Sequence, residues 1–196
     1  FSVVNELTSG RQMLSITYSD DLIYNHHLKV NQVGYRTDSP VKYGFFGAWM
    51  GSLGTLVDEA QNQPCLIVDV SSGDTVFESR LEFRHANDAA DEGPYQNNFT
   101  QEDLYICDFT SLDRPGEYYL KIPNRGRSYN FTIADHVYLH PFQVMMRGLF
   151  YQRSGQQLDE TNSAYRRVAS HLDPVEIPYM NDRSIRGGHY DAGDFN

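Results

Sequence analysis

Two aspartates near the end of the sequence have the residue type and spacing of half a hydrolytic site. Asp191 and Asp194 flank Ala192-Gly193 and follow the pair Gly187-Gly188. The small residues between them keep the backbone narrow, so a polar ligand can approach both carboxylates closely. Asp-Ala-Gly-Asp is also ordinary turn chemistry, in which the aspartates cap a turn or the start of a helix. The tetrapeptide alone leaves both interpretations open, and no partner acid follows it.

The composition narrows the classes of partner. The chain has 196 residues, a net charge of −10, 40% hydrophobic residues, 14 Tyr, 11 Phe and a single Trp. A chain of this length forms one large or two small domains, and its aromatic content favours β structure. No basic cluster exceeds Arg166-Arg167, which argues against a nucleic-acid partner. No apolar run approaches the roughly 20 residues of a membrane helix, so we expect no membrane partner either.

Residues 27–133 have the pattern of an all-β domain. Short runs of alternating apolar and polar residues are separated by turn sequences such as Ser71-Ser72-Gly73-Asp74 and Arg114-Pro115-Gly116. The runs predict strands at 28–31, 41–47, 65–70, 75–83, 104–109, 118–122 and 129–133. About seven strands at this spacing are typical of an antiparallel sandwich.

The two cysteines, Cys65 and Cys107, both lie in predicted strands. Tyr105 precedes Cys107 by two residues, as in the tyrosine corner of immunoglobulin domains. However, Trp49 precedes both cysteines, so the Cys-Trp-Cys order of antibody domains is not met. We therefore expect two buried free thiols, with a disulfide as the alternative.

The periodicity changes from strand to helix after Asp135. Apolar residues at helical spacing follow His140-Pro141: Phe142, Met145, Met146, Leu149 and Phe150. This stripe predicts a helix over about 141–153 whose apolar face packs in a core. Residues 156–190 are polar and predict an irregular loop. Because one helix cannot bury its own stripe, either it packs on the sandwich or further helices are missing.

Three blocks, in this order, together resemble glycoside hydrolase family 9 enzymes that carry an N-terminal immunoglobulin-like domain. They are Val30-Asn31-Gln32-Val33-Gly34-Tyr35-Arg36; Asp108-Phe109-Thr110-Ser111-Leu112 with Pro115-Gly116-Glu117-Tyr118-Tyr119-Leu120; and Phe150-Tyr151-Gln152-Arg153-Ser154-Gly155 with Gly187-Gly188 and Asp191-Ala192-Gly193-Asp194. The resemblance covers residues from about 27 to 196.

The resemblance implies a mostly β, immunoglobulin-like sandwich at 27–134, after an N-terminal extension at 1–26. Residues 135–196 would then hold the first helix and loop of an (α/α)6 barrel, truncated after the aspartates. The implied activity is hydrolysis of β-1,4-linked glucans with inversion, by a secreted or periplasmic enzyme whose partner is a β-linked oligo- or polysaccharide. We expect residues 1–196 alone to be inactive.

The same resemblance assigns roles at the site. Asp194 matches the catalytic base and Asp191 a carboxylate that positions the nucleophilic water, while the general acid is a Glu beyond residue 196. His189 and Tyr190 would line a sugar subsite, with simple packing as the alternative. Because cellulases of this family often have Trp where His189 stands, the sugar preference stays open.

Several family members hold a structural zinc near this site. The positions that match its ligands are Ser154, Ser170, His171 and Tyr190, of which only His171 is a zinc-binding side chain. Since a structural zinc needs about four N or S donors, we expect no metal or other cofactor, with hydrogen bonds in its place.

Two other functions stay open. One is an exo-acting β-glycosidase or glucosaminidase of the same family, which the His189 and zinc-site departures fit equally well. The other is a non-catalytic sandwich module that binds a ligand or partner, if residues 1–196 are the whole protein. The helix with an unpaired stripe argues against the second.

Overall fold

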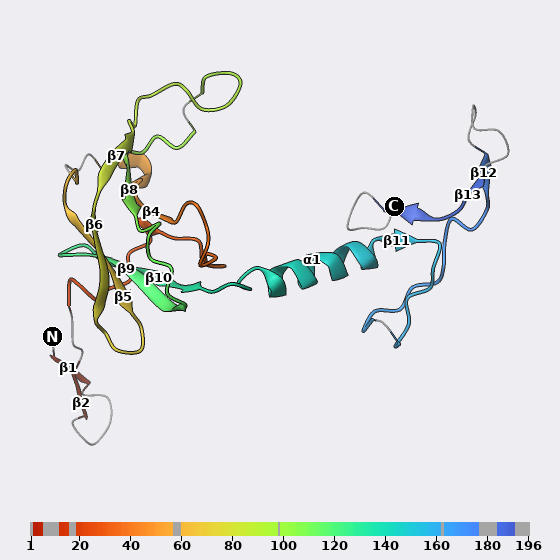
Figure 1. The fold of residues 1–196 in the computed structure, drawn as a ribbon, viewed down its shortest axis with the longest axis horizontal. Helices are drawn as coiled ribbons and strands as arrows, with labels where there is room; N and C mark the ends of the chain where they lie inside the picture. The colour runs from red at the N-terminus through yellow and green to blue at the C-terminus, as the bar shows by residue number, and fades with distance from the viewer. Residues whose placement is uncertain are drawn as a thin grey trace. The chain divides into compact units, whose positions relative to one another are not determined.

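The computed structural model describes residues 2–5, 12–15, 19–56, 60–97, 99–161, 163–176 and 184–190. It divides into two compact units, residues 1–138 and 139–196, each of which is described by itself. The first unit is built from ten strands and a short 3₁₀ helix among its described residues (Figure 1). Their bounds are β1 Ser2–Asn5, β2 Gln12–Ser15, β3 Leu28–Lys29, β4 Tyr43–Phe46, η1 Gly51–Leu53, β5 Pro64–Asp69, β6 Thr75–Arg80, β7 Glu82–His85, β8 Leu104–Asp108, β9 Gly116–Ile122 and β10 Gly126–Ile133.

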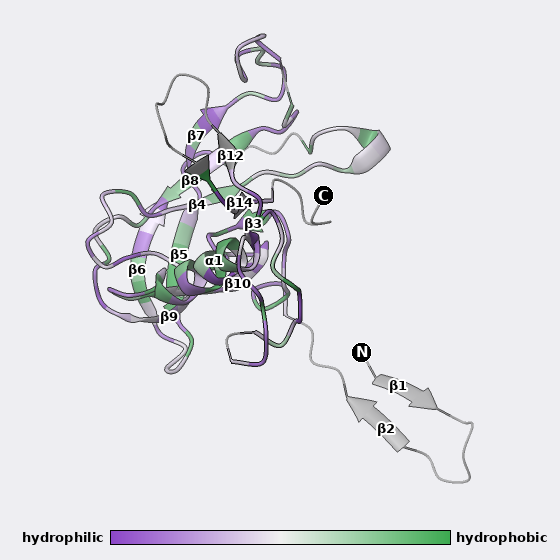
Figure 2. Ribbon diagram, turned by 90° about the vertical axis from the view of Figure 1, so that its right-hand side faces the viewer, coloured by the Kyte–Doolittle hydropathy of each residue, from purple (hydrophilic) through white to green (hydrophobic). Residues whose placement is uncertain are grey.

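Two four-stranded antiparallel sheets form a sandwich, which confirms the predicted fold class of this region. One sheet has the order β10-β9-β5-β6 and the other β3-β4-β8-β7, while β1 and β2 form a separate hairpin. The core lies between the two sheets and includes Ile67, Phe109, Leu120, Phe131 and Ile133, all buried. Figure 2 shows hydrophobic residues gathered in strands such as β5, whereas the edge strand β7 is largely hydrophilic.

The run 75–83, predicted as one strand, is two strands in different sheets. Strand β6 pairs with β5 and β7 pairs with β8, and Leu81 joins them. Leu81 is fully buried and exchanges backbone hydrogen bonds with Asn62 and Gln63. The chain therefore passes from one sheet to the other at this residue, which an uninterrupted run of strand-forming residues cannot reveal.

Side chains of β9 alternate between the core face and the outer face of the sheet, and one residue on the outer face is nevertheless buried. Tyr118, Leu120 and Ile122 face the core and are buried, as period-2 alternation requires. Tyr119 points to the opposite face and is nevertheless buried, because the Arg127 guanidinium lies 3.9 Å from its ring centroid. A cation over a tyrosine face is an attractive contact. The sheet thus keeps an aromatic ring on its outer side without exposing it.

The first of the three sequence blocks builds the turn between β3 and β4. The Asn31 amide donates to the Gly34 carbonyl at 2.8 Å, and the Tyr35 hydroxyl donates to the Tyr43 carbonyl at 2.6 Å. Gly34 has φ +115°, and a Cβ there would lie 2.3 Å from the Thr132 carbonyl oxygen. Only glycine fits this position, so the motif is a packing requirement of the sandwich edge.

Cys65 and Cys107 form a disulfide, and the expectation of two free thiols was wrong. Their Cα atoms lie 6.1 Å apart, within the range for a disulfide. The bond joins β5 of one sheet to β8 of the other, and both residues are fully buried. The missing Trp between the cysteines misled the prediction, because pairing depends on the facing strands and not on the Cys-Trp-Cys order.

The tyrosine corner is formed by Tyr118 and not by Tyr105. The buried Tyr118 hydroxyl donates to the Arg114 carbonyl at 3.0 Å, which is the backbone hydrogen bond that defines such a corner. Tyr105 is also buried, but it packs against Phe46 and Phe83. Its spacing to Cys107 was therefore coincidental.

The second unit begins with helix α1, Leu139–Tyr151, close to the predicted 141–153. Pro141 lies in the first turn, where a missing N–H costs no helical hydrogen bond. None of the helix residues is buried, and Phe142, Met145 and Leu149 are each more than half exposed. Two small antiparallel pairs follow: β11 Arg153–Ser154 with β14 Gly188–His189, and β12 Val175–Glu176 with β13 Ser184–Ile185. No helix among the described residues has the length and apolarity to cross a bilayer.

Candidate active site

The residues before the aspartate pair are held by a frame of backbone hydrogen bonds. Strands β11 and β14 pair Arg153 with His189 and Ser154 with Gly188. The frame extends at both ends, since the Tyr190 N–H donates to the Gln152 carbonyl at 2.8 Å and the Gly155 N–H to the Ser170 carbonyl at 2.8 Å. Segments that are about 15 and 35 residues apart in sequence thus meet directly before Asp191.

Glycines make this frame possible. Gly155 and Gly187 have φ values of +81° and +70°, and a Cβ on Gly155 would lie 2.7 Å from the Gly187 Cα. The Gly187 N–H also donates to the His171 carbonyl at 2.9 Å. The Arg-Ser-Gly turn and the Gly-Gly pair of the third sequence block therefore meet at their glycines, because any side chain would force the two backbones apart.

Tyr190 lies at the centre of a polar and aromatic cluster. Its hydroxyl is hydrogen-bonded to Ser170 Oγ, which is also 3.4 Å from His171 Nδ1. The His171 ring packs edge-on against the Tyr190 ring at 5.4 Å, and the Arg167 guanidinium carbon lies 4.8 Å from the centroid of the same ring. Tyr190 is half-buried, and its ring and hydroxyl both have protein partners.

Three of the positions that match zinc ligands gather in this cluster, and the fourth is next to it. Ser170, His171 and Tyr190 contact one another, and Ser154 lies in β11 opposite Gly188. The set offers one imidazole and three hydroxyls. Since structural zinc sites use Cys and His, sometimes with a carboxylate, these residues do not fit zinc. The hydrogen bond between Ser170 and Tyr190 joins two of the segments that carry these residues.

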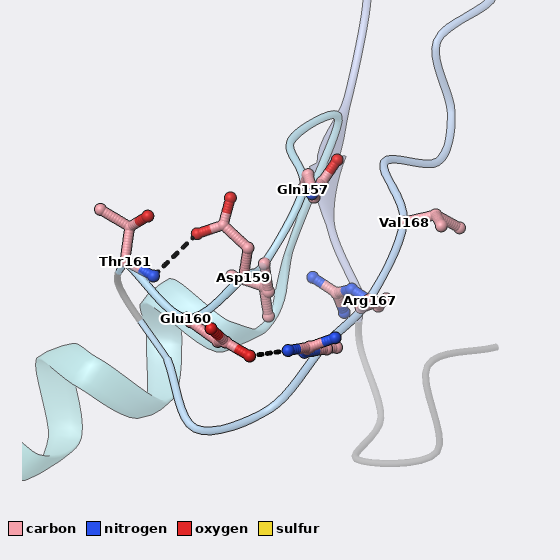
Figure 3. Close-up of a pocket in the computed structure, with 8 residues that line it drawn as sticks. Gln157, Asp159, Glu160, Thr161, Arg167 and Val168 are labelled. Atoms are coloured by element: carbon pink, nitrogen blue, oxygen red, sulfur yellow. Dashed lines mark hydrogen bonds and ion pairs between the residues drawn. The ribbon is translucent and has the colours of Figure 1, made fainter.

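Arg167 belongs to this site, and sequence reasoning did not identify it. Its backbone exchanges hydrogen bonds with Leu158 at 2.8 and 3.0 Å, which closes the loop 158–167. This loop lines a cavity of about 510 Å³ with Asp159, Glu160 and Thr161, and Figure 3 shows the Arg167 side chain directed into the loop. The sequence presents Arg167 only as part of a basic pair, and nothing in its spacing links it to Tyr190.

The remaining predicted site residues are placed only in part. His189 lies in β14 with its side chain exposed, so it is available to a ligand. Asp191 and Asp194 lie outside the described residues, and their roles stay predictions. The described frame ends at Tyr190, one residue before the pair.

The sandwich matches a family model. Residues 24–127, just over half of the chain, match the cellulase N-terminal immunoglobulin-like domain. The chain belongs to this family. Endoglucanase D from Acetivibrio thermocellus is 36% identical over 107 residues, which cover 51% of this chain and 17% of the relative.

Solved structures extend the likeness beyond the sandwich. A metagenome-derived glycoside hydrolase family 9 endoglucanase is 25% identical with a TM-score of 0.59, over 85% of this chain and 29% of that one. A family 9 protein of Bacteroides ovatus shares the fold at 24% identity and a TM-score of 0.60, over 88% of this chain and 29% of that one. The chain thus corresponds to an N-terminal part of the cellulase family and spans less than a third of these relatives.

Proposed function

We propose that this chain is the N-terminal part of an inverting glycoside hydrolase that cleaves β-1,4-glucan or cello-oligosaccharides. Residues 1–26 form an extension, 27–134 the supporting sandwich and 135–196 the start of the catalytic domain. The observation that carries the proposal is the glycine-built frame that ends at Tyr190, directly before Asp191 and Asp194, in a chain related to endoglucanases.

The aspartates have separate roles in this proposal. Inverting hydrolysis needs an ionised carboxylate that activates water and a protonated carboxyl that protonates the leaving oxygen, about 6.5–9.5 Å apart. Asp194 acts as the base and takes a proton from the water, while Asp191 holds that water in place. The water oxygen attacks the anomeric carbon as the glycosidic bond breaks, and a general acid outside residues 1–196 supplies the proton to the departing sugar.

The substrate in this proposal is a β-linked oligo- or polysaccharide, and His189 contacts it. His189 is exposed and lies two residues before Asp191 in the sequence, and an imidazole can hydrogen-bond sugar hydroxyls or stack on a sugar face. An exo-acting glycosidase of the same family is the second candidate, because a polar imidazole here suits the end of a short chain as well as an extended glucan.

The buried disulfide supports a secreted or periplasmic location. Disulfides form and persist in oxidising compartments and are rare in the cytosol. The Cys65–Cys107 bond crosses the core of the sandwich, so the domain acquires it as it folds. We infer that folding takes place outside the reducing cytosol.

Hydrolysis by the full-length protein tests the proposal. We expect release of sugars from cello-oligosaccharides, with the product's anomeric configuration inverted when followed by NMR. Asp194→Ala should abolish turnover with an unchanged melting temperature. Glu82→Ala, which removes an exposed carboxylate of strand β7, serves as the matched control and should keep wild-type turnover. Near-normal turnover by Asp194→Ala would remove it from the role of base.

Two further comparisons separate the alternatives. Oligosaccharides labelled at one end distinguish cleavage within the chain from release of terminal sugars, and a panel that includes amino sugars tests the glucosaminidase alternative. Residues 1–196 alone should not hydrolyse glycans. Turnover by this part alone would contradict the need for a general acid beyond residue 196.

A further inference from the structure

Tyr190 is the last described residue before the proposed water-positioning Asp191, and its contacts fix it on several sides. Its N–H bonds to the Gln152 carbonyl at 2.8 Å, and its hydroxyl to Ser170 Oγ. One ring contact is the edge-on packing of His171, and another is the Arg167 guanidinium at 4.8 Å. Together these contacts hold the residue from which the aspartate segment starts.

Arg167 connects three segments of the second unit. Its backbone is held by both hydrogen bonds to Leu158, a residue buried to 3% exposure. Its guanidinium donates to the Arg153 carbonyl in β11, the strand that pairs with β14, and lies against the Tyr190 ring. The side chain therefore connects the loop 158–167 to β11 and to Tyr190, the residue that follows β14.

The chemistry of this contact depends on arginine. The guanidinium is a planar, permanently charged group that can stack on an aromatic face while its N–H groups still donate hydrogen bonds. One Arg167 N–H is bonded to the Arg153 carbonyl, and the cation lies near the Tyr190 ring. These contacts direct the guanidinium toward the strand frame. This orientation fits a role in positioning the frame better than a role in binding a sugar.

We propose that Arg167 is a positioning residue, which acts through the Tyr190 ring on the segment that begins at Asp191. This inference rests on the proposed function. A base and its water must be held closely to the productive geometry, and a displacement of about 1 Å costs on the order of 100-fold in rate. Loss of the Arg167 contact should therefore lower kcat and leave substrate binding nearly unchanged.

The test uses the full-length protein and a matched pair of variants. Arg167→Gln keeps a hydrogen-bonding side chain but removes the cation, and we expect kcat to fall roughly 10-fold or more with KM changed less than about twofold. Arg84→Gln changes an exposed arginine of strand β7 in the sandwich, which belongs to neither the cavity nor the frame. This control should have the kcat and KM of the wild type.

A double-mutant cycle shows whether the effect passes through Tyr190. If it does, Arg167→Gln should lower kcat in the wild type and in Tyr190→Phe, which keeps the ring, but have little effect in Tyr190→Leu. Arg167→Lys retains a cation and should restore part of the loss. All rates are measured well below the melting temperature of each variant, so that unfolding does not contribute.

Three results would overturn the inference. Wild-type kcat in Arg167→Gln would show that the residue is not needed, and a raised KM with unchanged kcat would show that it binds substrate. Equal losses in the wild-type and Tyr190→Leu backgrounds would show that it does not act through the ring. If the wild-type protein hydrolyses no β-linked glycan, the proposed function fails instead, which is a separate and earlier outcome.

Discussion

Lys42 is a buried charged residue of the sandwich, and its hydrogen bonds to two backbone carbonyls should stabilise the fold. Its side chain is 1% exposed, and its ammonium donates to the Thr110 carbonyl at 2.9 Å and the Ser39 carbonyl at 3.3 Å. Lys42→Met fills a similar volume but leaves two carbonyls without this donor. We expect the free energy of unfolding in urea to fall by about 1–3 kcal/mol.

Lys29→Met provides the control for Lys42. The Lys29 ammonium pairs with Glu102 and its side chain is 42% exposed. Loss of this ion pair in Lys29→Met should lower the free energy of unfolding by less than about 1 kcal/mol, as for other exposed ion pairs. If Lys42→Met were as stable as the wild type, the free-energy cost of desolvating the ammonium would equal the stabilisation that its hydrogen bonds provide.

The tyrosine corner gives a second prediction for a single residue. Tyr118→Phe removes only the hydroxyl, which donates to the Arg114 carbonyl and also accepts from Nε of the exposed Arg114 side chain at 3.3 Å. We expect a loss of about 1 kcal/mol in the free energy of unfolding, the usual net value of one hydrogen bond. Tyr129→Phe, at an exposed position, should leave stability unchanged. An equal effect of both substitutions would mean that the corner contributes nothing specific.

At the scale of elements, a loop after β7 is closed by a carboxylate. Glu92 accepts hydrogen bonds from the Phe99 N–H and from the Thr100 N–H and hydroxyl. The Thr100 hydroxyl, more than any other group, holds the pKa of the Glu92 carboxyl below its ordinary value of 4.5, and His85 adds a smaller effect. Because the folded pKa is lowered, the loop is stabilised at higher pH and loses this contribution as the pH falls through the lowered pKa.

NMR can follow this closure directly. The amide signals of Phe99 and Thr100 should shift on acidification with a midpoint below the ordinary glutamate pKa of 4.5. In Glu92→Gln the side chain at position 92 cannot ionise. The Phe99 and Thr100 amide signals should therefore lose this acid-induced shift. A midpoint above 4.5 in the wild type would contradict the hydrogen-bonded carboxylate.

The elements show why some of the fold was predictable from sequence. Alternation and turn residues located the sandwich strands, and the Phe142–Leu149 stripe located α1, because both signals are local. The passage at Leu81 and the Cys65–Cys107 bond depend on which strands face each other across the core. Those relations are not encoded in spacing, so both predictions there were wrong.

The same division applies to the candidate site. Gly155 and Gly187 were predicted because their turn motifs are contiguous in sequence, whereas the roles of Asp191 and Asp194 stay predictions. Arg167 was not predicted, since its contact with Tyr190 requires the loop 158–167 to close at Leu158. A residue whose role comes from three separate segments has no local signal, and it becomes visible only when the segments are placed together.

At the scale of the whole molecule, the two units are stabilised in different ways. The sandwich has a closed core and a disulfide, whereas the described helix exposes its apolar stripe. An amphipathic helix owes most of its stability to packing of that face. This contrast fits the proposal that the stripe belongs to a helical barrel, in which further helices would cover it.

The disulfide supplies the final prediction, because it links the two sheets of the sandwich. Cys65 and Cys107 are 42 residues apart, and a cross-link of this span restricts the unfolded chain by roughly 4 kcal/mol in the chain-entropy model. Cys65→Ala/Cys107→Ala should therefore lower the free energy of unfolding in urea by about 2–5 kcal/mol. Dithiothreitol should destabilise the wild type similarly and leave the double variant unaffected. The contrary result would be that the reduced wild type and the double variant both unfold at the urea midpoint of the oxidised wild type. In that case the packed core alone holds the sheets together, and the disulfide is dispensable for the fold.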